Sequence, residues 1–322
     1  MTTGSPSAAG PGHPVGISTP PVMLAQLAEL HGGEVDRPAR ASIIARIAPL
    51  DAGGADDLCP FTSRRYAKEA LASPALLLVD AGLAGLVPIG RRWVHPHAAW
   101  ALAGILAELE RGAAAPEPFA APVVASDASV AAGVVIMAGA QIGPACVVEP
   151  NAVIYPRVVL GARVLVGACA VLGRPGFGWA MGPGGNQRRI PQLGGVRVDD
   201  DVEIGPLVTV DAGTLAPTVV GRGARLDAHV HVGHNVEVGP AAMVAAQSGF
   251  AGSVKVGAGA RIGGQVGIAD HVRVGAGAQI AAKSGVIGDI RESSVVAGYP
   301  ATDRGRWFRG MARMLRVSGK PK

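Results

Sequence analysis

Between residues 124 and 286, an aliphatic residue, once replaced by Phe, returns at every sixth position. The series breaks after Leu172, resumes at Val198 and shifts by four residues before Val220; its members are Val124, Val130, Ile136, Ile142, Val148, Ile154, Leu160, Val166, Leu172, Val198, Ile204, Val210, Val220, Leu226, Val232, Val238, Val244, Phe250, Val256, Ile262, Ile268, Val274, Ile280 and Val286. A period of six fits neither an α-helix nor a simple alternating strand. It is typical of a parallel β-helix, in which three short strands form a triangular coil and the periodic side chain points inward. The next residue is usually Gly, Ala, Asp or Glu, and we expect Gly there to supply the positive φ of a sharp corner.

Several segments flank or interrupt this repeat, which we place at residues 124–300. Residues 1–21 are rich in Ser, Gly and Pro and lack a secretion-signal pattern, which predicts a disordered leader. A linker rich in Pro and Ala is predicted at 113–123, an insert at 173–195 and a basic C-terminal segment at 301–322. Inserts in solenoids project from one face and often shape a binding site.

Residues 22–112 follow a different pattern, which predicts a small α/β domain. Val22–Leu30 and Ala98–Glu110 have helical spacing of apolar residues. Ile43–Ile47 and Leu76–Asp80 are short apolar runs typical of buried strands. The chain is therefore expected to be mainly β, with this domain before the β-helix.

Composition narrows the class of protein. Aromatic residues make up 4% of the chain and Gly numbers 47, which suits a thin solenoid better than a bulky core. Cys59, Cys146 and Cys169 are far apart without a CxxC pair, which argues against a disulfide framework or a metal site and for a reducing compartment, the cytoplasm. No apolar run approaches the roughly 20 residues of a membrane-spanning helix, so no integral membrane segment is expected.

The C-terminal segment concentrates the positive charge of a chain whose net charge is +5. After Asp303 it has no further acid and carries Arg304, Arg306, Arg309, Arg313, Arg316, Lys320 and Lys322. Apolar residues fall at the spacing of an amphipathic helix, at Trp307, Met311, Met314 and Leu315. The charge favours an acidic partner. Nucleic acid is disfavoured because no stacking aromatics are interleaved with the charge.

The densest break in the aliphatic pattern contains His229, His231 and His234, preceded by Asp227. A histidine near neutral pKa can act as a general base, and Asp227 could hold its ring and stabilise the imidazolium. Ordinary solvent-facing histidines are the simpler alternative. Zinc bound by three histidines out of these and His271 is another alternative, but His229 and His231 are expected to share a strand face while His234 lies around the next corner.

Seven motifs resemble segments of the UDP-3-O-(3-hydroxyacyl)glucosamine N-acyltransferase family, which performs the third step of lipid A synthesis. They are GFGW at 176–179, RIPQLG at 189–194, VGHN at 232–235, AAQSGFAGS at 245–253, GGQVGIADH at 263–271, IAAKSGV at 280–286 and AGYPA at 297–301. The likeness runs from Val22 to about Arg316. Hexapeptides alone indicate only the broad acyltransferase superfamily, whereas the GFG…IPQ insert together with HN and GGQVGIA-H is specific to this branch.

The resemblance implies a homotrimer of left-handed β-helices with an active site in each cleft between subunits. It implies transfer of a 3-hydroxyacyl chain from acyl carrier protein to the 2-amine of a UDP-3-O-acylglucosamine lipid. No cofactor is expected beyond the phosphopantetheine arm of the carrier. By position, His234 matches the general base, His271 an assisting histidine and Asp227 the acidic residue before the catalytic histidine. The backbone N–H of Gly252 matches the donor to the thioester oxygen.

The resemblance also implies substrate-binding residues, which are Phe61, Tyr66, Phe177, Gln192, Asn235 and Gln247. Phe61 and Tyr66 stand where the family stacks uracil between a Phe and a Tyr, although the Phe is displaced by one position. Two further departures are Asp227-Ala228-His229 in place of Asp-Asn-Gln, and Asp211-Ala212-Gly213 in place of Asp-Arg-Gly.

Two other functions remain open at the level of sequence. A hexapeptide N-acetyltransferase that uses acetyl-CoA on a nucleotide amino sugar would share the repeat, but the N-terminal domain and the insert argue against it. A non-catalytic solenoid that only binds a ligand would also share the repeat. The combination of His234, Asp227 and Gly252 argues against that reading.

Overall fold

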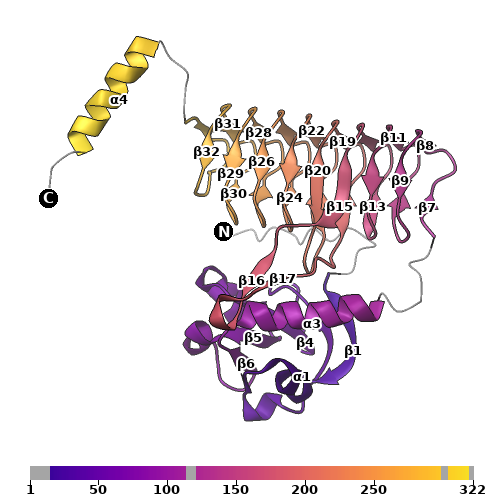
Figure 1. The fold of residues 1–322 in the computed structure, drawn as a ribbon, viewed down its shortest axis with the longest axis vertical. Helices are drawn as coiled ribbons and strands as arrows, with labels where there is room; N and C mark the ends of the chain where they lie inside the picture. Colours follow the sequence, from indigo (N-terminus) through magenta and orange to yellow (C-terminus); the bar gives the residue numbers. More distant parts are fainter. Residues whose placement is uncertain (1–14, 114–120, 299–303, 319–322) are drawn as a thin grey trace.

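A computed structural model describes residues 15–113, 121–298 and 304–318. They form an α/β domain, a β-helix above it in Figure 1, and a separate C-terminal helix. The mainly β architecture, with its short strands in parallel sheets, confirms the predicted fold class.

The β-helix has three walls, each a parallel sheet to which every coil adds one strand. Wall 1 contains β7 (Val123–Val124), β10 (Gln141–Ile142), β13 (Val158–Leu160), β18 (Val196–Val198), β21 (Thr218–Val220), β24 (Glu237–Val238), β27 (Lys255–Val256) and β30 (Arg273–Val274). Wall 2 contains β8 (Ser129–Val130), β11 (Val147–Val148), β14 (Leu165–Val166), β19 (Glu203–Ile204), β22 (Arg225–Leu226), β25 (Met243–Val244), β28 (Arg261–Ile262), β31 (Gln279–Ile280) and β33 (Val295–Val296). Wall 3 contains β9 (Val135–Ile136), β12 (Val153–Ile154), β15 (Val171–Pro175), β20 (Thr209–Ala212), β23 (His231–Val232), β26 (Gly249–Phe250), β29 (Gly267–Ile268) and β32 (Gly285–Val286).

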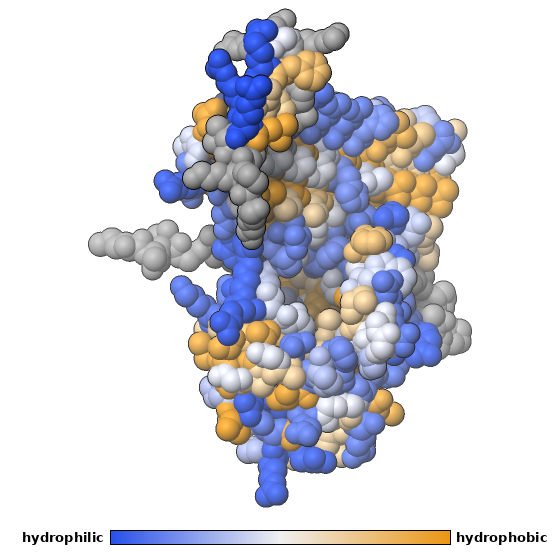
Figure 2. Space-filling model, turned by 60° about the vertical axis from the view of Figure 1, so that its left-hand side comes forward, coloured by the Kyte–Doolittle hydropathy of each residue, from blue (hydrophilic) through white to orange (hydrophobic). Residues whose placement is uncertain are grey.

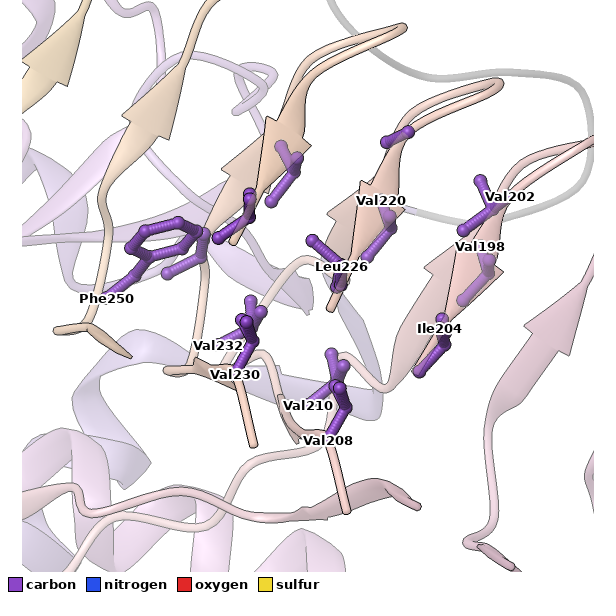
Figure 3. Packing of buried hydrophobic residues seen from close by; sticks show 14 of the residues in the cluster. Val198, Val202, Ile204, Val208, Val210, Val220, Leu226, Val230, Val232 and Phe250 are labelled. Atoms are coloured by element: carbon purple, nitrogen blue, oxygen red, sulfur yellow. The ribbon is translucent and has the colours of Figure 1, made fainter. Parts of the chain in front are cut away.

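The predicted periodic residues form the core of this prism. From Ile142 to Val286 all of them are buried, and each pairs in register with its equivalents in the neighbouring coils, as Val210 does with Val232 and Val232 with Phe250. Figure 3 shows these side chains stacked in rows along the interior. Val124 and Val130 are about two-fifths exposed, because they belong to the first coil and have a neighbouring coil on one side only.

The corners differ from the expectation that Gly supplies their positive φ. The positive φ belongs to the third residue after the periodic one, and in the coils around Asn235 and His271 that residue is mostly not Gly. Glycines directly after the periodic residue are needed for another reason. A Cβ on Gly233 would lie 2.7 Å from the carbonyl oxygen of Phe250 in the next coil, so Gly lets the backbones approach closely.

The N-terminal domain is a six-stranded sheet in the order β1-β3-β4-β5-β6-β2. Its strands are β1 (Ile17–Met23), β2 (Glu34–Val35), β3 (Ile43–Ile47), β4 (Asp57–Phe61), β5 (Leu76–Asp80) and β6 (Arg92–His95). Its helices are α1 (Leu24–His31), η1 (Arg37–Ala39), η2 (Arg64–Tyr66), α2 (Ala67–Ala72), η3 (Ala81–Leu86) and α3 (Ala98–Ala113). The predicted strands at 43–47 and 76–80 and the helix from Ala98 are confirmed.

The predicted leader is wrong at its C-terminal end. Residues 17–21 belong to β1, which pairs antiparallel with β3, and Val22 lies within this strand instead of opening a helix, because β1 ends at Met23. Pro20 and Pro21 are tolerated because β1 is the edge strand of the sheet. On its outer side no strand pairs with it, so the missing N–H groups of the prolines cost no backbone hydrogen bond there. Residues 1–14 and most of the predicted linker, 114–120, lie outside the described residues.

The insert joins the two domains. It forms a hairpin of β16 (Trp179–Met181) and β17 (Gln187–Arg189), with η4 (Pro183–Gly185) at its tip, and Figure 1 shows it reaching from the β-helix to α3. The Arg188 guanidinium stacks 3.9 Å from the ring centre of Trp100 and donates to the Trp100 carbonyl at 3.1 Å. Leu193 and Leu215 join the apolar core of the N-terminal domain.

The basic segment forms α4 (Arg304–Ser318), which Figure 1 places beyond the last coil. Its arginines Arg309, Arg313 and Arg316 are exposed, and Met314 is 66% exposed. Figure 2 shows hydrophilic and apolar side chains together at this end of the molecule. None of the described helices is long and apolar enough to cross a membrane.

We predict that replacing one inward residue destabilises the β-helix far more than replacing its outward neighbour. Leu226 is 1% exposed, so Leu226→Ala should cost about 2–5 kcal/mol of unfolding free energy through lost contacts and a cavity. Arg225→Ala, one residue away on the outside, is the control and should change it by less than about 1 kcal/mol. Urea unfolding measures both. Equal losses would contradict the inward assignment of Leu226.

Candidate active site

The edge between walls 3 and 1 carries most of the residues predicted as catalytic, and we call it the His234 edge. From β23 onward, strand partners in wall 3 are 18 residues apart from one coil to the next, so His234, Gly252 and Asp270 occupy equivalent corner positions in three successive coils. Backbone hydrogen bonds fix this stack: the Ser253 N–H donates to the His234 carbonyl at 2.8 Å and the His271 N–H to the Gly252 carbonyl at 3.0 Å. The edge therefore brings His234, Gly252 and His271 together.

The hydrogen bonds of Asn235 decide which nitrogen of His234 can accept a proton. Asn235 Nδ2 donates to the Ala216 carbonyl at 3.2 Å, and its Oδ1 accepts from the Thr214 N–H at 3.2 Å, which fixes the orientation of the amide. Oδ1 is therefore the acceptor that lies 3.1 Å from His234 Nδ1. A neutral ring then carries its proton on Nδ1 and leaves the Nε2 lone pair free, as a general base requires.

Gly252 lies directly against the free nitrogen of His234. A Cβ built at Gly252 would be 2.6 Å from His234 Nε2 and Cε1, so any side chain there would displace the ring. Among the described residues, the Gly252 N–H has no acceptor. A base and an unused N–H side by side can deprotonate an attacking group and stabilise a developing oxyanion.

Gln192 and Asn235 support His234 through a continuous polar network. Gln192 is 6% exposed, its Nε2 donates to the Ile190 carbonyl, and its Oε1 lies 2.9 Å from the Thr214 hydroxyl. The same hydroxyl lies 2.8 Å from Asn235 Oδ1. Both residues were predicted to bind substrate, which stays a prediction; the hydrogen bonds of this chain show that they also orient the His234 ring.

Tyr66 joins the N-terminal domain to the His234 edge. Its hydroxyl lies 2.5 Å from His271 Nδ1, and the two rings meet edge to face with centres 5.6 Å apart. Burial lowers the pKa of His271 and outweighs the carboxylate of Asp270, which raises it, while Arg65 and His234 lower it further. Burial raises the pKa of Tyr66. Near pH 7 the contact is therefore between a neutral imidazole and a neutral hydroxyl.

Asp227 and Gln247 lie on another edge, between walls 2 and 3, which we call the Asp227 edge. Asp227 stands at the opposite end of β23 from His234, and its carboxylate accepts from the backbone N–H groups of Ala228 at 2.7 Å and Ala246 at 3.2 Å. Gln247 Oε1 accepts from a glutamine of the next coil at 2.6 Å. Within one chain Asp227 therefore does not hold the His234 ring, contrary to the simplest form of the prediction.

The two predicted phenylalanines have opposite environments. Phe61 is fully buried at the end of β4 in the core of the N-terminal domain, so it has no ring face to stack on uracil, and that expectation is wrong. Its apolar neighbours in β5 and α2 account for the burial, which the sequence motif alone could not reveal. Phe177, in the insert, is 83% exposed and remains available to a ligand.

Sequence reasoning missed the ion pair of Arg174 and Asp211 beside this site. Arg174 Nε donates to Asp211 Oδ1 at 2.9 Å, and the Asp211 side chain is 2% exposed. His231 Nε2 lies 3.8 Å from the other carboxylate oxygen. The pair forms because a bulge in β15 sets Arg174 opposite Asp211 in β20, a register hidden by the interrupted repeat.

The histidines weighed as metal ligands are spread over the β-helix. His229 lies at the Asp227 edge, His231 on wall 3, and His234 and His271 at the His234 edge. Within residues 15–113, 121–298 and 304–318, no three His, Cys, Asp or Glu side chains are grouped so that they could hold a metal ion.

Comparison with known proteins first relates the repeat of the β-helix to the hexapeptide transferases. The family model described as bacterial transferase hexapeptide (six repeats) matches residues 139–174. The fold is thus the left-handed parallel β-helix that the resemblance implied.

Individual relatives define the family more narrowly. The UDP-3-O-acylglucosamine N-acyltransferase of Rhizobium johnstonii is 43% identical over 263 residues, which cover 71% of this chain and 74% of that protein. Its namesake in Myxococcus xanthus is 56% identical over 147 residues, 44% of this chain and 42% of the relative. The match with the Anaeromyxobacter dehalogenans protein likewise spans 42% of that relative, so these alignments cover less than half of either protein. The chain belongs to the UDP-3-O-acylglucosamine N-acyltransferase family.

A solved structure is also similar in part. The UDP-N-acetylglucosamine acyltransferase of Campylobacter jejuni aligns with 63% of this chain and 84% of its own, at 21% identity and a TM-score of 0.48.

We predict that His271 titrates below the ordinary histidine pKa of about 6.5, because burial disfavours its charged form. The unfolded chain then binds more protons below about pH 6.5, so this residue's contribution to stability is present above that pH and is lost as pH falls toward the lower folded pKa. An NMR titration of labelled histidine side chains measures the value, with His271→Gln identifying the resonance. A pKa at or above 6.5 would contradict the expected effect of burial.

Proposed function

We propose that the protein transfers a 3-hydroxyacyl chain from acyl carrier protein to the 2-amine of UDP-3-O-acylglucosamine, giving UDP-2,3-diacylglucosamine in lipid A synthesis. The single observation that carries this proposal is the free Nε2 of His234 beside the unused N–H of Gly252. Family membership supplies the acceptor, because the relatives are named for N-acylation of UDP-3-O-acylglucosamine.

In the proposed reaction, the amine nitrogen attacks the thioester carbonyl while His234 Nε2 takes a proton from it. The carbonyl oxygen gains negative charge and accepts a hydrogen bond from the Gly252 N–H, which is strongest when that charge is greatest. The C–S bond then breaks, an amide forms, and the imidazolium returns its proton to the leaving thiolate. Asn235 keeps the proton of the neutral ring on Nδ1, so Nε2 is ready for each cycle.

The proposed donor is an acyl thioester on the phosphopantetheine arm of acyl carrier protein, and no separate cofactor is required. The exposed arginines Arg309, Arg313 and Arg316 of α4 support this choice, because a basic helix at the end of the molecule suits an acidic carrier. We also propose that the reaction takes place in the cytoplasm.

We further propose that the active protein is a homotrimer. Asp227 and Gln247, which the resemblance assigns to the same site as His234, lie on a different edge of the β-helix. A neighbouring subunit that turns its Asp227 edge toward the His234 edge would join the two groups in one cleft. This arrangement also explains why the Asp227 carboxylate points to no group of the His234 edge in its own chain.

The function is tested by purified enzyme, UDP-3-O-acylglucosamine and two donors. Transfer is expected from a 3-hydroxyacyl carrier thioester and not from acetyl-CoA. His234→Ala should lower kcat by roughly 10²–10⁴, because the general base is lost, while the circular dichroism spectrum stays unchanged. His271→Ala should lower it less. Preference for acetyl-CoA would make the protein an N-acetyltransferase, and no transfer by a folded protein would favour a binding role.

A second variant keeps His234 but fills the space that its ring occupies. Gly252→Ala puts a methyl group where His234 Nε2 lies and should lower kcat nearly as much as His234→Ala. Gly249→Ala is the matched control, because a Cβ there meets nothing within 4 Å in the chain. Unchanged kcat in Gly252→Ala would contradict the close contact between Gly252 and the His234 ring on which the mechanism depends.

We predict that two inactive variants restore each other in mixed trimers. If each site takes His234 from one subunit and Asp227 from the next, co-expressed His234→Ala and Asp227→Asn chains leave about a quarter of the sites intact. Activity should therefore exceed that of either variant alone, and analytical ultracentrifugation should show trimers. A stable, active monomer would contradict the assembly. Stable mixed trimers without recovery would contradict the sharing of Asp227.

A further inference from the structure

We propose that Arg174, anchored by Asp211, binds the diphosphate of the nucleotide-sugar acceptor next to His234. The inference rests on the proposed function and adds a binding role for a side chain outside the catalytic pair. Neither the sequence motifs nor the names of the relatives assign any role to Arg174.

The first support is the way in which Arg174 is held. Its Nε donates to Asp211 Oδ1 at 2.9 Å, and Asp211 is buried while Arg174 is 47% exposed. A buried carboxylate fixes the guanidinium through Nε and leaves the two terminal nitrogens for another acceptor. Among the described residues, those nitrogens donate to none. A preorganised guanidinium edge is suited to bidentate binding of phosphate oxygens.

The second support is that the Arg174–Asp211 ion pair lies close to His234. Gly176 lies between them: a Cβ there would be 3.1 Å from Asp211 Oδ2 and 2.9 Å from His234 Cβ. The Asp211 carboxylate, which holds Arg174, and the His234 side chain are therefore both in contact with one position, that of Gly176.

The third support is the chemistry of the acceptor. In a UDP-glucosamine, the reacting amine is on C2 and the diphosphate is on C1, so the two groups are on adjacent ring atoms. An amine placed against His234 Nε2 must bring the sugar-proximal phosphate to the immediate surroundings of His234. The nearest cation there with free donors is expected to receive it.

The charges around the pair agree with an anionic ligand. The Arg189 guanidinium donates to the carbonyls of Pro175 and Gly176 at 3.2 and 3.3 Å, so a second cation borders the same segment. His231, on the other side of Asp211, has its Nδ1 2.7 Å from the Thr209 hydroxyl. Arg174, Arg189 and Asp211 together carry a net positive charge before any histidine is protonated.

A purely structural ion pair is the alternative, and the chain offers one for comparison. Arg163 Nε lies 2.6 Å from Asp201 Oδ1 on the edge between walls 1 and 2, and both side chains are about half exposed. Exposed pairs of this kind contribute little to stability. Asp211 differs because it is buried and because Gly176, two residues after its arginine, lies against both Asp211 and His234.

The test compares two double variants by calorimetric binding of UDP-N-acetylglucosamine and of uridine. Arg174→Met with Asp211→Asn removes the guanidinium without leaving a buried charge. Arg163→Met with Asp201→Asn removes the equivalent pair on the other edge. The first should weaken binding of UDP-N-acetylglucosamine about tenfold or more, through lost charge-assisted hydrogen bonds, and leave uridine binding unchanged. The second should change neither.

Three results would overturn the inference. Unchanged affinity for UDP-N-acetylglucosamine in the Arg174 variant would exclude a contact with the diphosphate. An equal loss for uridine would indicate general damage to the site. A selective loss of binding for 4′-phosphopantetheine would assign Arg174 to the donor instead. Failure of the proposed function is a separate outcome, because it would appear in the wild-type protein as a lack of acyl transfer.

Discussion

The stacking of each coil on the next is the constraint on which the rest of the structure depends. An aliphatic side chain stabilises a coil only when its equivalents lie directly above and below it, and the backbones must then approach closely enough to share hydrogen bonds at every wall. Gly233 meets this demand at the His234 edge, where any Cβ would strike the carbonyl of Phe250. Once the spacing is fixed at 18 residues, a corner residue has a predetermined neighbour in the next coil.

The candidate site uses this fixed spacing directly. His234 and Gly252 are 18 residues apart and therefore adjacent, without any side chain having evolved to hold them together. The segments outside the repeat add further contacts to this site. The insert brings Gln192 to the hydrogen-bond network of Asn235, and the N-terminal domain brings Tyr66 to His271. A regular frame thus sets the distance between base and oxyanion donor, and irregular segments set the orientation and surroundings of the base.

Much of this could be predicted from sequence, because the six-residue period leaves few alternatives for the fold. The inward residues and the interruption at the insert follow from counting along the chain, whereas the grouping of His234 with Gly252 and His271 was implied by the family resemblance. Phe61 could not be placed, because its burial depends on packing between β4, β5 and α2, which have no repeat to reveal it. Arg174 and Asp211 could not be paired either, because the insert and a bulge hide their register.

The even stacking of the walls also limits how the length of this molecule can change. Adding or removing a complete coil at the first coils near Val124, or at the last near Val286, would preserve the register of all three walls. Adding a single residue would turn an inward row outward and expose a line of aliphatic side chains. Within the strands, growth and shortening are therefore possible only in whole coils outside the stretch from Gly176 to His271, whereas extra residues between strands must leave the prism as a corner loop, as the insert does.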